Sequence, residues 1–187
     1  MMKFRAFIAV EMGELSDLEQ LHSELSGLGV GVKPVDLGHL HVTLKFLGDT
    51  EESLVPKLEE IIRTASAGIG PLTIRLRGSG TFPPRPPARV VWVGLEGAES
   101  LALIANRLER ACQALGFEPE RRPFKPHLTL ARVKDPRASD SVISLTEKYA
   151  HAEFGSVNIN SILLKKSVLG PKGPTYTTVI TSPLASP

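Results

Sequence analysis

Apolar and polar residues follow two different periods along the first half of the chain. Residues 4–10 are apolar and β-prone and stop at the acidic Glu11, which is typical of a strand. Residues 14–28 instead place leucines three and four positions apart before Gly29, as on one face of a helix with a stop signal beyond it. Both patterns then return. The first half is predicted to hold a strand at 4–10, a helix at 14–28, a strand at 40–47 and a helix at 51–65.

The second half of the chain repeats this succession. Its patterns predict strands at 72–76 and 89–95, a helix at 100–115, a strand at 127–133, a short helix at 140–149, and strands within 153–165 and at 176–181. Residues 82–87 contain four prolines and can form neither a helix nor a central strand. Residues 170–173 are interpreted as a hairpin turn. This mixture predicts the α+β class, with hairpin-like strand neighbours.

Composition narrows the class of protein further. The chain has 187 residues, of which 42% are hydrophobic and 22% charged, so a disordered chain or a fibre is excluded and one compact unit is expected. No uncharged run approaches the roughly 18 apolar residues of a membrane helix, and the N-terminus lacks the apolar core of a signal peptide. We therefore expect no membrane association and a cytoplasmic location.

Cysteine usage and charge limit the chemistry. Cys112 is the single cysteine, so neither an internal disulfide nor a multi-cysteine metal cage can form, and a reducing compartment is expected. The 22 Lys and Arg residues against 20 Asp and Glu leave a formal charge of +2. This charge is too small for a general nucleic-acid coat protein, so any anion site must be local.

Two tetrapeptides of the pattern His-apolar-Thr-apolar occur in corresponding places of the two halves: 41–44 and 127–130. In a strand, residues i and i+2 share a face, so each histidine points the same way as its threonine and away from the two apolar residues. The duplication suggests two related lobes that each contribute one such strand. If the lobes face one another, two imidazoles and two hydroxyls converge on one cleft.

Such a cleft suits acid/base chemistry on a phosphate. Imidazole has an unperturbed pKa of about 6.5, so His41 and His127 can supply one neutral and one protonated ring near neutral pH. The hydroxyls of Thr43 and Thr129 donate hydrogen bonds to phosphoryl oxygens without adding charge. A 2′,3′-cyclic phosphate suits the arrangement because its strained ring reacts without a metal. A zinc site is the sharper rival, but no third ligand stands at recognisable spacing beside either motif.

Residues 41–49 and 124–132 resemble the twin motifs of the two-histidine phosphoesterases. Within these they resemble the RNA 2′,3′-cyclic phosphodiesterases, also called the LigT-like or 2′-5′ RNA ligase family. The likeness extends over nearly the whole chain through residues 5–11, 89–94 and 167–176. It implies a bilobal, pseudo-symmetric α+β fold in which residues 1–187 form a single two-lobed domain, with two antiparallel sheets lining a central groove and helices outside.

The resemblance also implies an activity and a site. The activity is metal-independent hydrolysis of RNA 2′,3′-cyclic phosphate ends to a 2′-phosphate, with reversible 2′-5′ ligation as a side activity. His41 takes the proton-donor role and His127 the acceptor role, Thr43 and Thr129 hold the phosphate, and Arg132 matches a basic residue near it. Strict alternation places Arg132 on the face opposite His127, so a twist or bulge at the strand end is needed to bring it back.

The expected partners follow from the same resemblance, whereas the expectations for single side chains follow from the residues themselves. The partners are RNA ends or oligonucleotides that carry a cyclic phosphate, with tRNA fragments as one candidate source, and we expect no cofactor, no metal and a monomer. A non-catalytic module that binds RNA ends in the same groove is the alternative. Lys45 shares the parity of His41 and is a candidate to attract the RNA backbone. Phe82 is a candidate to stack on a base, whereas Trp92 in its apolar strand is expected in the core.

Overall fold

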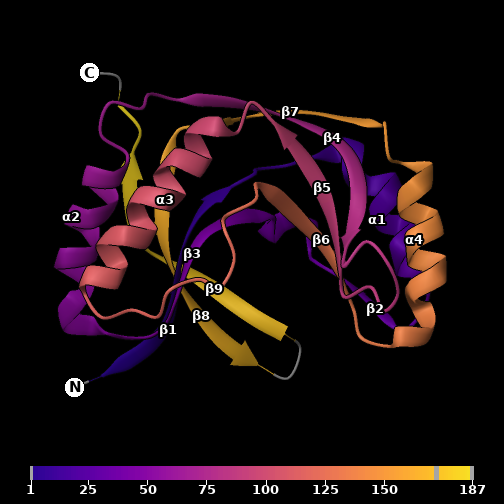
Figure 1. The fold of residues 1–187 in the computed structure, drawn as a ribbon, viewed down its shortest axis with the longest axis horizontal. Helices are drawn as coiled ribbons and strands as arrows, with labels where there is room; N and C mark the ends of the chain where they lie inside the picture. The colour runs from indigo at the N-terminus through magenta and orange to yellow at the C-terminus, as the bar shows by residue number, and fades with distance from the viewer. Residues whose placement is uncertain (1, 171–172, 186–187) are drawn as a thin grey trace.

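The computed structural model describes residues 2–170 and 173–185, which form two antiparallel sheets with paired helices (Figure 1). Sheet A has the strand order β3-β1-β8-β9, and sheet B has the order β2-β6-β5-β4-β7. The strands of sheet A are β1 (Lys3–Glu11), β3 (His41–Glu51), β8 (Ser161–Gly170) and β9 (Gly173–Pro183). The strands of sheet B are β2 (Val32–Pro34), β4 (Leu72–Phe82), β5 (Val90–Glu96), β6 (His127–Val133) and β7 (Glu153–Ile159).

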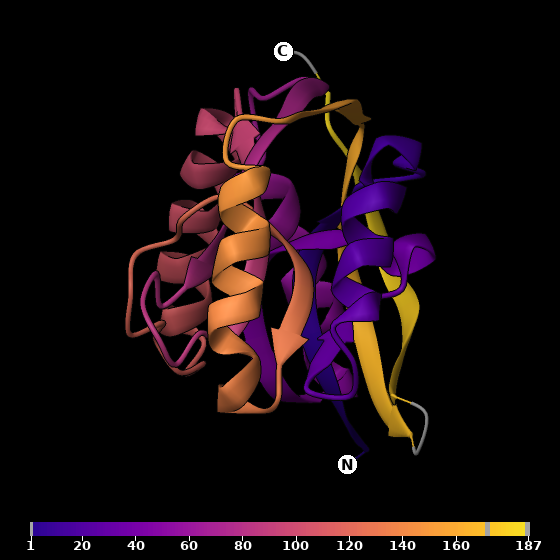
Figure 2. The same ribbon diagram turned by 90° about the vertical axis from the view of Figure 1, so that its right-hand side faces the viewer.

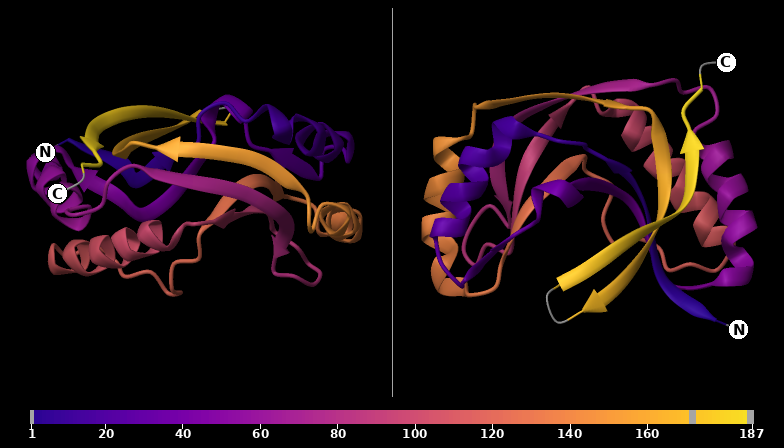
Figure 3. Two further views of the ribbon diagram at one scale, coloured as in Figure 1. Left: turned by 90° about the horizontal axis from the view of Figure 1, so that it is seen from above. Right: turned by 180° about the vertical axis from the view of Figure 1, so that it is seen from behind.

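Each sheet is covered by its own pair of helices. Helices α2 (Val55–Ala65) and α3 (Glu99–Ala114) pack on each other and against strands of sheet A. Helices α1 (Glu19–Gly27) and α4 (Ser139–Lys148) contact each other and strands of sheet B, and lie side by side in Figure 2. In the view from behind in Figure 3, β8 and β9 lie between the two helix pairs. The predicted α+β class with two antiparallel sheets is confirmed.

The lobes are not the two halves of the sequence. Sheet A combines two early strands, β1 and β3, with the late strands β8 and β9, whereas sheet B takes most of its strands from the middle of the chain. The twin motifs still divide as expected, because residues 41–44 begin β3 in sheet A and residues 127–130 begin β6 in sheet B. Each lobe therefore contributes one motif strand.

One hydrophobic cluster joins both sheets to their helices. Helix α2 buries Leu58 and Ile62 completely, and helix α3 buries Leu101 and Leu108, because these residues recur at helical spacing on the face turned to the sheet. From sheet A, Ile8 of β1 is also fully buried. Removal of these side chains from water is the main force that holds helices and sheets together.

Three details of the strands were not contained in the sequence prediction. The short strand β2, which includes Pro34, was not predicted because three residues carry no measurable period. The β-prone stretch 153–165 is broken at Asn160 into β7 and β8, which belong to different sheets. Strand β4 continues to Phe82, with a backbone irregularity around Gly78, whose φ is +69°. Long-range pairing, which local pattern does not record, decides all three.

Two further expectations concern the chain as a whole. Strands β8 and β9 pair as far as Gly170 and Gly173, while residues 171–172 of the predicted hairpin turn lie outside the described residues. Within the described ranges, no helix is long and apolar enough to cross a membrane.

Candidate active site

The first motif histidine begins β3 in sheet A. A distance of 2.8 Å separates His41 Nδ1 from the carbonyl oxygen of His39. Because a carbonyl oxygen only accepts, Nδ1 carries the proton and donates it. The ring also packs beside two aromatic side chains, with centroid distances of 5.1 Å to Phe7 and 5.2 Å to Tyr176. These contacts orient the imidazole and leave Nε2 as the nitrogen available to a substrate.

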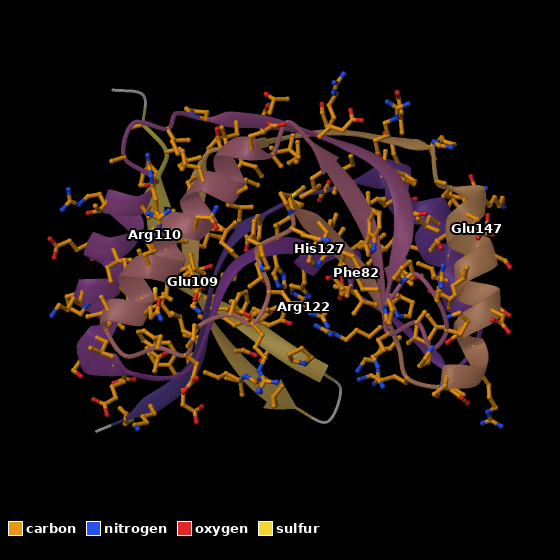
Figure 4. The ribbon with its side chains drawn as sticks, viewed as in Figure 1. Phe82, Glu109, Arg110, Arg122, His127 and Glu147 are labelled. Carbon is orange, nitrogen blue, oxygen red and sulfur yellow. The ribbon has the colours of Figure 1, made fainter. Side chains whose placement is uncertain are left out.

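The second motif histidine is held in the same way at the start of β6. His127 Nδ1 donates to the carbonyl oxygen of Lys125 over 2.7 Å, again the residue two positions earlier in the chain. The ring of Phe82 meets the imidazole edge to face, with centroids 5.2 Å apart and an interplanar angle of 90°. Figure 4 shows Phe82 next to His127 between the lobes. Both imidazoles therefore share one tautomer, with Nε2 left for chemistry.

The threonines lie on the same faces as their histidines, as the strand period predicts. Thr43 and Thr129 are half-buried, like His41 and His127. The intervening apolar residues are buried in the core: Val42, Leu44, Leu128 and Leu130. Each motif thus presents one imidazole and one hydroxyl on a partly exposed face while its other side anchors the strand.

A β-bulge follows the second motif and returns Arg132 to the histidine face. Thr129 and Ala131 pair with consecutive residues of β5, so Leu130 has no partner of its own. The extra residue shifts the alternation by one position, which buries Ala131 and exposes Arg132. The bulge that sequence alternation required for this residue is therefore present.

A matching bulge follows the first motif. Thr43 and Lys45 pair with consecutive residues of β1, so Leu44 is the extra residue, in the position that corresponds to Leu130. The shift places Lys45 on the core face, where it is 1% exposed, and places Phe46 on the histidine face, where it is 57% exposed. The expectation that Lys45 attracts the RNA backbone is wrong, because the bulge reverses its parity.

Lys45 instead ties β3 to helix α3. Its ammonium lies 2.9 Å from Glu109 Oε2 and donates to the carbonyl oxygen of Glu118 over 2.7 Å. A buried ammonium without such partners would be strongly unfavourable. Burial by itself would raise the pKa of the Glu109 carboxyl, but the hydrogen bond from Lys45 holds that pKa below its usual value. This pair fixes the strand directly after the first motif.

The two motif strands approach one another between the sheets. Strands β3 and β6 are in contact although they belong to different sheets. Burial raises the pKa of Tyr176, and the nearby positive charges of Arg132 and Arg5 oppose that rise. Tyr176 packs on His41, so a cation of the second motif strand acts on the surroundings of the first histidine. The arrangement brings together groups from both lobes.

The electrostatic surroundings of His41 come from residues that the motif does not contain. Glu11 lies directly across from His41 in the β1–β3 pair, and Lys165 of β8 forms an ion pair with Glu11 and donates to Thr178 Oγ1 over 3.0 Å. Burial lowers the pKa of His41, the Lys165 charge lowers it further, and the hydrogen bond to His39 and the Glu11 charge oppose this. The neutral imidazole is therefore favoured at His41.

Sequence reasoning missed this second layer of the site. Phe7, Glu11 and Tyr176 stand in segments that resemble the family, which was a signal for them, but Lys165 carries no pattern that distinguishes it from an ordinary strand residue. They reach the site only because β1, β3, β8 and β9 pair in register. Their identification needs the fold.

Trp92 lies beside the second motif and outside the main hydrophobic cluster, so the core position expected for it is wrong. It pairs directly across from Thr129, and its ring centroid lies 5.4 Å from that of Phe82. Its indole covers Gly80, where an added Cβ would come within 2.4 Å of the ring. The indole Nε1 is buried and has no hydrogen-bond partner within the described structure.

Across residues 2–170 and 173–185, no group of three or more His, Cys, Asp or Glu side chains is arranged to hold a metal ion. Cys112 is buried in α3, and burial raises the pKa of its thiol to about 11. The groups that the site offers are imidazoles, hydroxyls and the guanidinium of Arg132.

A two-lobed fold whose facing strands each begin with His-apolar-Thr-apolar defines the class of two-histidine phosphoesterases. The sequence pattern of the 2′-5′ RNA ligase superfamily matches residues 14–164. A protein of Methanothermobacter thermautotrophicus named RNA 2′,3′-cyclic phosphodiesterase is 39% identical over 178 residues, which cover 94% of this chain and 96% of that protein. The chain therefore belongs to the 2′-5′ RNA ligase superfamily, as the twin motifs predicted.

Solved structures show the same fold. A protein of Thermus thermophilus superposes with a TM-score of 0.79 and 30% identity over 97% of this chain and 98% of its own. E. coli LigT complexed with 3′-AMP superposes with a TM-score of 0.75 and 23% identity over 99% of this chain and all of its own. The predicted LigT-like fold is confirmed.

Proposed function

We propose that this protein hydrolyses RNA 2′,3′-cyclic phosphate ends to 2′-phosphates without a metal ion. The observation that carries the proposal is the matched state of the two motif histidines, each of which donates Nδ1–H to the carbonyl two residues earlier and keeps Nε2 for the substrate. Two such nitrogens can exchange protons with two different oxygens of one phosphate. Relatives that share nearly the full length of the chain are named for this activity.

The reaction balances with the side chains that the site contains. Neutral His127 takes a proton from water through Nε2 while the water oxygen forms a bond to phosphorus. The bond between phosphorus and the ribose 3′-oxygen breaks, and protonated His41 gives its Nε2 proton to that oxygen, which leaves a 2′-phosphate. The assignment of donor and acceptor follows the family resemblance, because the two motifs are chemically near-identical. The lowered pKa of His41 makes its imidazolium a stronger acid, but it also means that only part of the molecules carry that proton near neutral pH.

The phosphate is held by the residues beside the histidines. Thr43 and Thr129 offer hydroxyl donors on the same faces as the imidazoles, and Arg132 offers a guanidinium that can bind two phosphoryl oxygens at once. A cation and neutral donors stabilise the charge that develops on the phosphoryl oxygens in the transition state. The 3′-AMP bound by E. coli LigT, which has the same fold, supports a nucleoside phosphate as the ligand class.

Product analysis on a short oligonucleotide with a 2′,3′-cyclic phosphate end tests the proposal. We expect a 2′-monophosphate end, activity that survives a chelator, and a loss of at least ~100-fold in rate for His41→Ala and for His127→Ala, the low end for removal of an acid or base group. Near-full turnover by either variant, in a preparation free of contaminating nuclease, contradicts the mechanism. A shift in the mobility of the oligonucleotide while its cyclic phosphate stays intact favours the RNA-end-binding module. Loss of activity in the presence of chelator, restored by added metal, favours the zinc site.

The same chemistry with a different nucleophile gives the second part of the proposal. When the attacking oxygen belongs to the 5′-hydroxyl of a second RNA strand instead of water, the same two proton transfers join the strands by a 2′-5′ linkage. An acceptor oligonucleotide with a 5′-hydroxyl should then yield a longer product. Absence of that product at high acceptor concentration, while hydrolysis proceeds, limits the activity to hydrolysis.

A further inference from the structure

Two cations lie side by side on the histidine face of sheet B. In the β2–β6 pair, Lys33 lies directly across from Arg132, and both side chains are exposed. Directly paired residues of an antiparallel sheet point to the same face. Because the bulge at Leu130 puts Arg132 on the face of His127, Lys33 is on that face as well.

Such a pair is unfavourable unless an anion lies beside it, because like charges directly across two strands destabilise a sheet. Within the described ranges, neither Lys33 nor Arg132 forms an ion pair with a carboxylate. The acidic residues closest to them in sequence are engaged elsewhere. Asp135 binds Arg137 over 2.7 Å, and Asp36 accepts from a backbone N–H two residues further on over 2.8 Å. Both positive charges thus remain available to a ligand.

Strand β2 is short, but hydrogen bonds on both sides of it hold it against β6. The N–H of Val35 donates to the carbonyl oxygen of Leu130, the bulge residue, over 2.8 Å. On the other side, the N–H of Lys134 donates to the carbonyl oxygen of Gly31 over 2.7 Å. A strand of three residues therefore holds Lys33 in a fixed place at the edge of the sheet.

The distance along β6 suits a second phosphate. The histidine face of this strand presents His127, Thr129 and then Arg132. At about 3.3 Å per residue, Arg132 lies no more than roughly 10 Å beyond Thr129. The long side chain of Arg132 can reach back towards a phosphate at His127, whereas Lys33 lies one strand further out. An anion bound by both cations is therefore next to the cyclic phosphate and separate from it.

Sheet A approaches the same pair of cations from the other lobe. A Cβ added to Gly173, at the start of β9, would stand 3.6 Å from Lys33 Nζ. The positive charge of Arg132 acts on Tyr176, also in β9, whose ring centroid lies 5.2 Å from that of His41. Both cations are therefore near the strand that supplies an aromatic neighbour of the first histidine. This places them beside the site and not on an unrelated surface.

We propose that Lys33 and Arg132 bind the phosphodiester that joins the terminal nucleotide of the RNA to the nucleotide before it. The proposal rests on the proposed function, because it places the cyclic phosphate between His41 and His127. Arg132 has five N–H donors and can contact both phosphates, whereas Lys33 contacts only the second. Cations that follow the backbone bind a single strand without reading its bases. The protein therefore prefers an RNA end to a single nucleoside cyclic phosphate.

The test compares two substrates that differ in the second phosphate. One is adenosine 2′,3′-cyclic phosphate with a free 5′-hydroxyl, and the other carries a methyl phosphate diester on the 5′-oxygen. We expect Lys33→Met to reduce the preference for the diester, measured as a ratio of kcat/KM values, by roughly 5- to 10-fold. This range lies between the loss of an exposed ion pair and the loss of a hydrogen bond to a charged group. Lys33→Arg keeps the charge and should keep most of the preference.

The matched control is Lys57→Met, which removes one positive charge from an exposed side chain on α2 and should leave the preference unchanged. Lys33→Met should have a Tm at or above the original, because it removes the repulsion from Arg132. A lower Tm with an equal loss on both substrates assigns Lys33 to structure and overturns the proposal.

Two other results also overturn it. Lysine on an edge strand can protect a sheet against pairing with a second chain. Aggregation of Lys33→Met with an unchanged preference for the diester would assign the residue to that role. An equal fall of the preference in Lys57→Met would assign the effect to net charge.

A binding measurement separates this proposal from the proposed function. Calorimetry gives Kd for adenosine 2′-monophosphate with and without the same 5′-diester, in the absence of turnover. If the protein hydrolyses neither cyclic substrate, the proposed function fails, while a preference in Kd for the diester that falls in Lys33→Met still supports the phosphodiester site. If hydrolysis proceeds and neither preference depends on Lys33, the phosphodiester site alone fails.

The salt dependence of binding gives an independent measure of the same contact. The ligand is a trinucleotide with a 2′-phosphate end. The slope of log Kd against log salt concentration should be smaller by about 0.7 in Lys33→Met, the value for one phosphate contact of a single strand. An unchanged slope contradicts the contact.

Discussion

Substitution of Gly80 by alanine should disturb the second motif from a position that touches neither histidine. An added Cβ would stand 2.4 Å from Trp92 Cζ2, 2.9 Å from Cη2 and 3.0 Å from Cε2. Carbon atoms pack best at about 3.5–4.0 Å, so the indole has to move by about 1 Å or more. Overpacking of this kind typically destabilises a protein by ~1–3 kcal/mol. For a chain of this size each kcal/mol lowers Tm by roughly 2–4 °C, so we expect a decrease of about 2–12 °C.

The displaced indole should also reduce turnover. Trp92 lies directly across from Thr129 and packs against Phe82, which contacts His127. A shift of about 1 Å in groups that position a substrate can reduce the rate by about 100-fold. We expect kcat on a cyclic phosphate substrate to decrease, by at most about 100-fold.

Thermal unfolding followed by circular dichroism measures the change in Tm, and steady-state kinetics on a cyclic phosphate substrate measures kcat. Tryptophan emission reports the displacement of the indole, since the chain has a single tryptophan. Gly27→Ala in α1 is the control, because an added Cβ there meets no atom within 4 Å and alanine should stabilise the helix by ~0.4–1 kcal/mol. An unchanged Tm together with unchanged emission and kcat in Gly80→Ala would refute the packing argument.

Three further predictions concern charge and burial. Lys165→Met removes a cation that lowers the pKa of His41, so the pKa of His41 should rise in this variant. Because a general acid must be protonated, the alkaline limb of the pH profile of kcat/KM should then move to higher pH. Movement of the acid limb alone would instead show that His41 is the base. Lys45→Ala should lower the free energy of unfolding, measured in urea, by about 3 kcal/mol. This value is the lower end for a broken buried ion pair, because Glu109 keeps contact with water. A decrease below about 1 kcal/mol contradicts this prediction. The Cys112 thiol, with a pKa of about 11, should resist alkylation at pH 8 until the protein unfolds, and fast labelling of the native state would show that α3 opens.

Strand parity in the motifs could be predicted from sequence because it depends on local alternation alone. His41, Thr43, His127 and Thr129 lie on the faces that this alternation assigns to them. The rule fails directly beyond each motif, where Lys45 turns inward. A bulge depends on how a strand pairs with its neighbour, and no residue of the motif predicts it.

The residues that approach the motifs from distant parts of the sequence could not be predicted, for the same reason. Lys165 and Tyr176 approach His41 because β8 pairs with β1 and with β9, across more than a hundred residues of chain. The pattern of residues 153–165 predicts β-structure, but it does not show that the chain passes from one sheet to the other at Asn160. Periodicity predicts which face of a strand or helix is buried, but the element against which that face packs is known only from the three-dimensional structure.

The strand order of sheet A has a consequence for how the protein matures on the ribosome. Strand β1 emerges early, but one of its two partners, β8, is synthesised only after the whole of sheet B. Pairing between such distant segments is slow to form and leaves an apolar edge open meanwhile. The surroundings of the first histidine are thus completed last among the strands of the fold, so a nascent chain acquires a competent centre only after β8 and β9 have been synthesised.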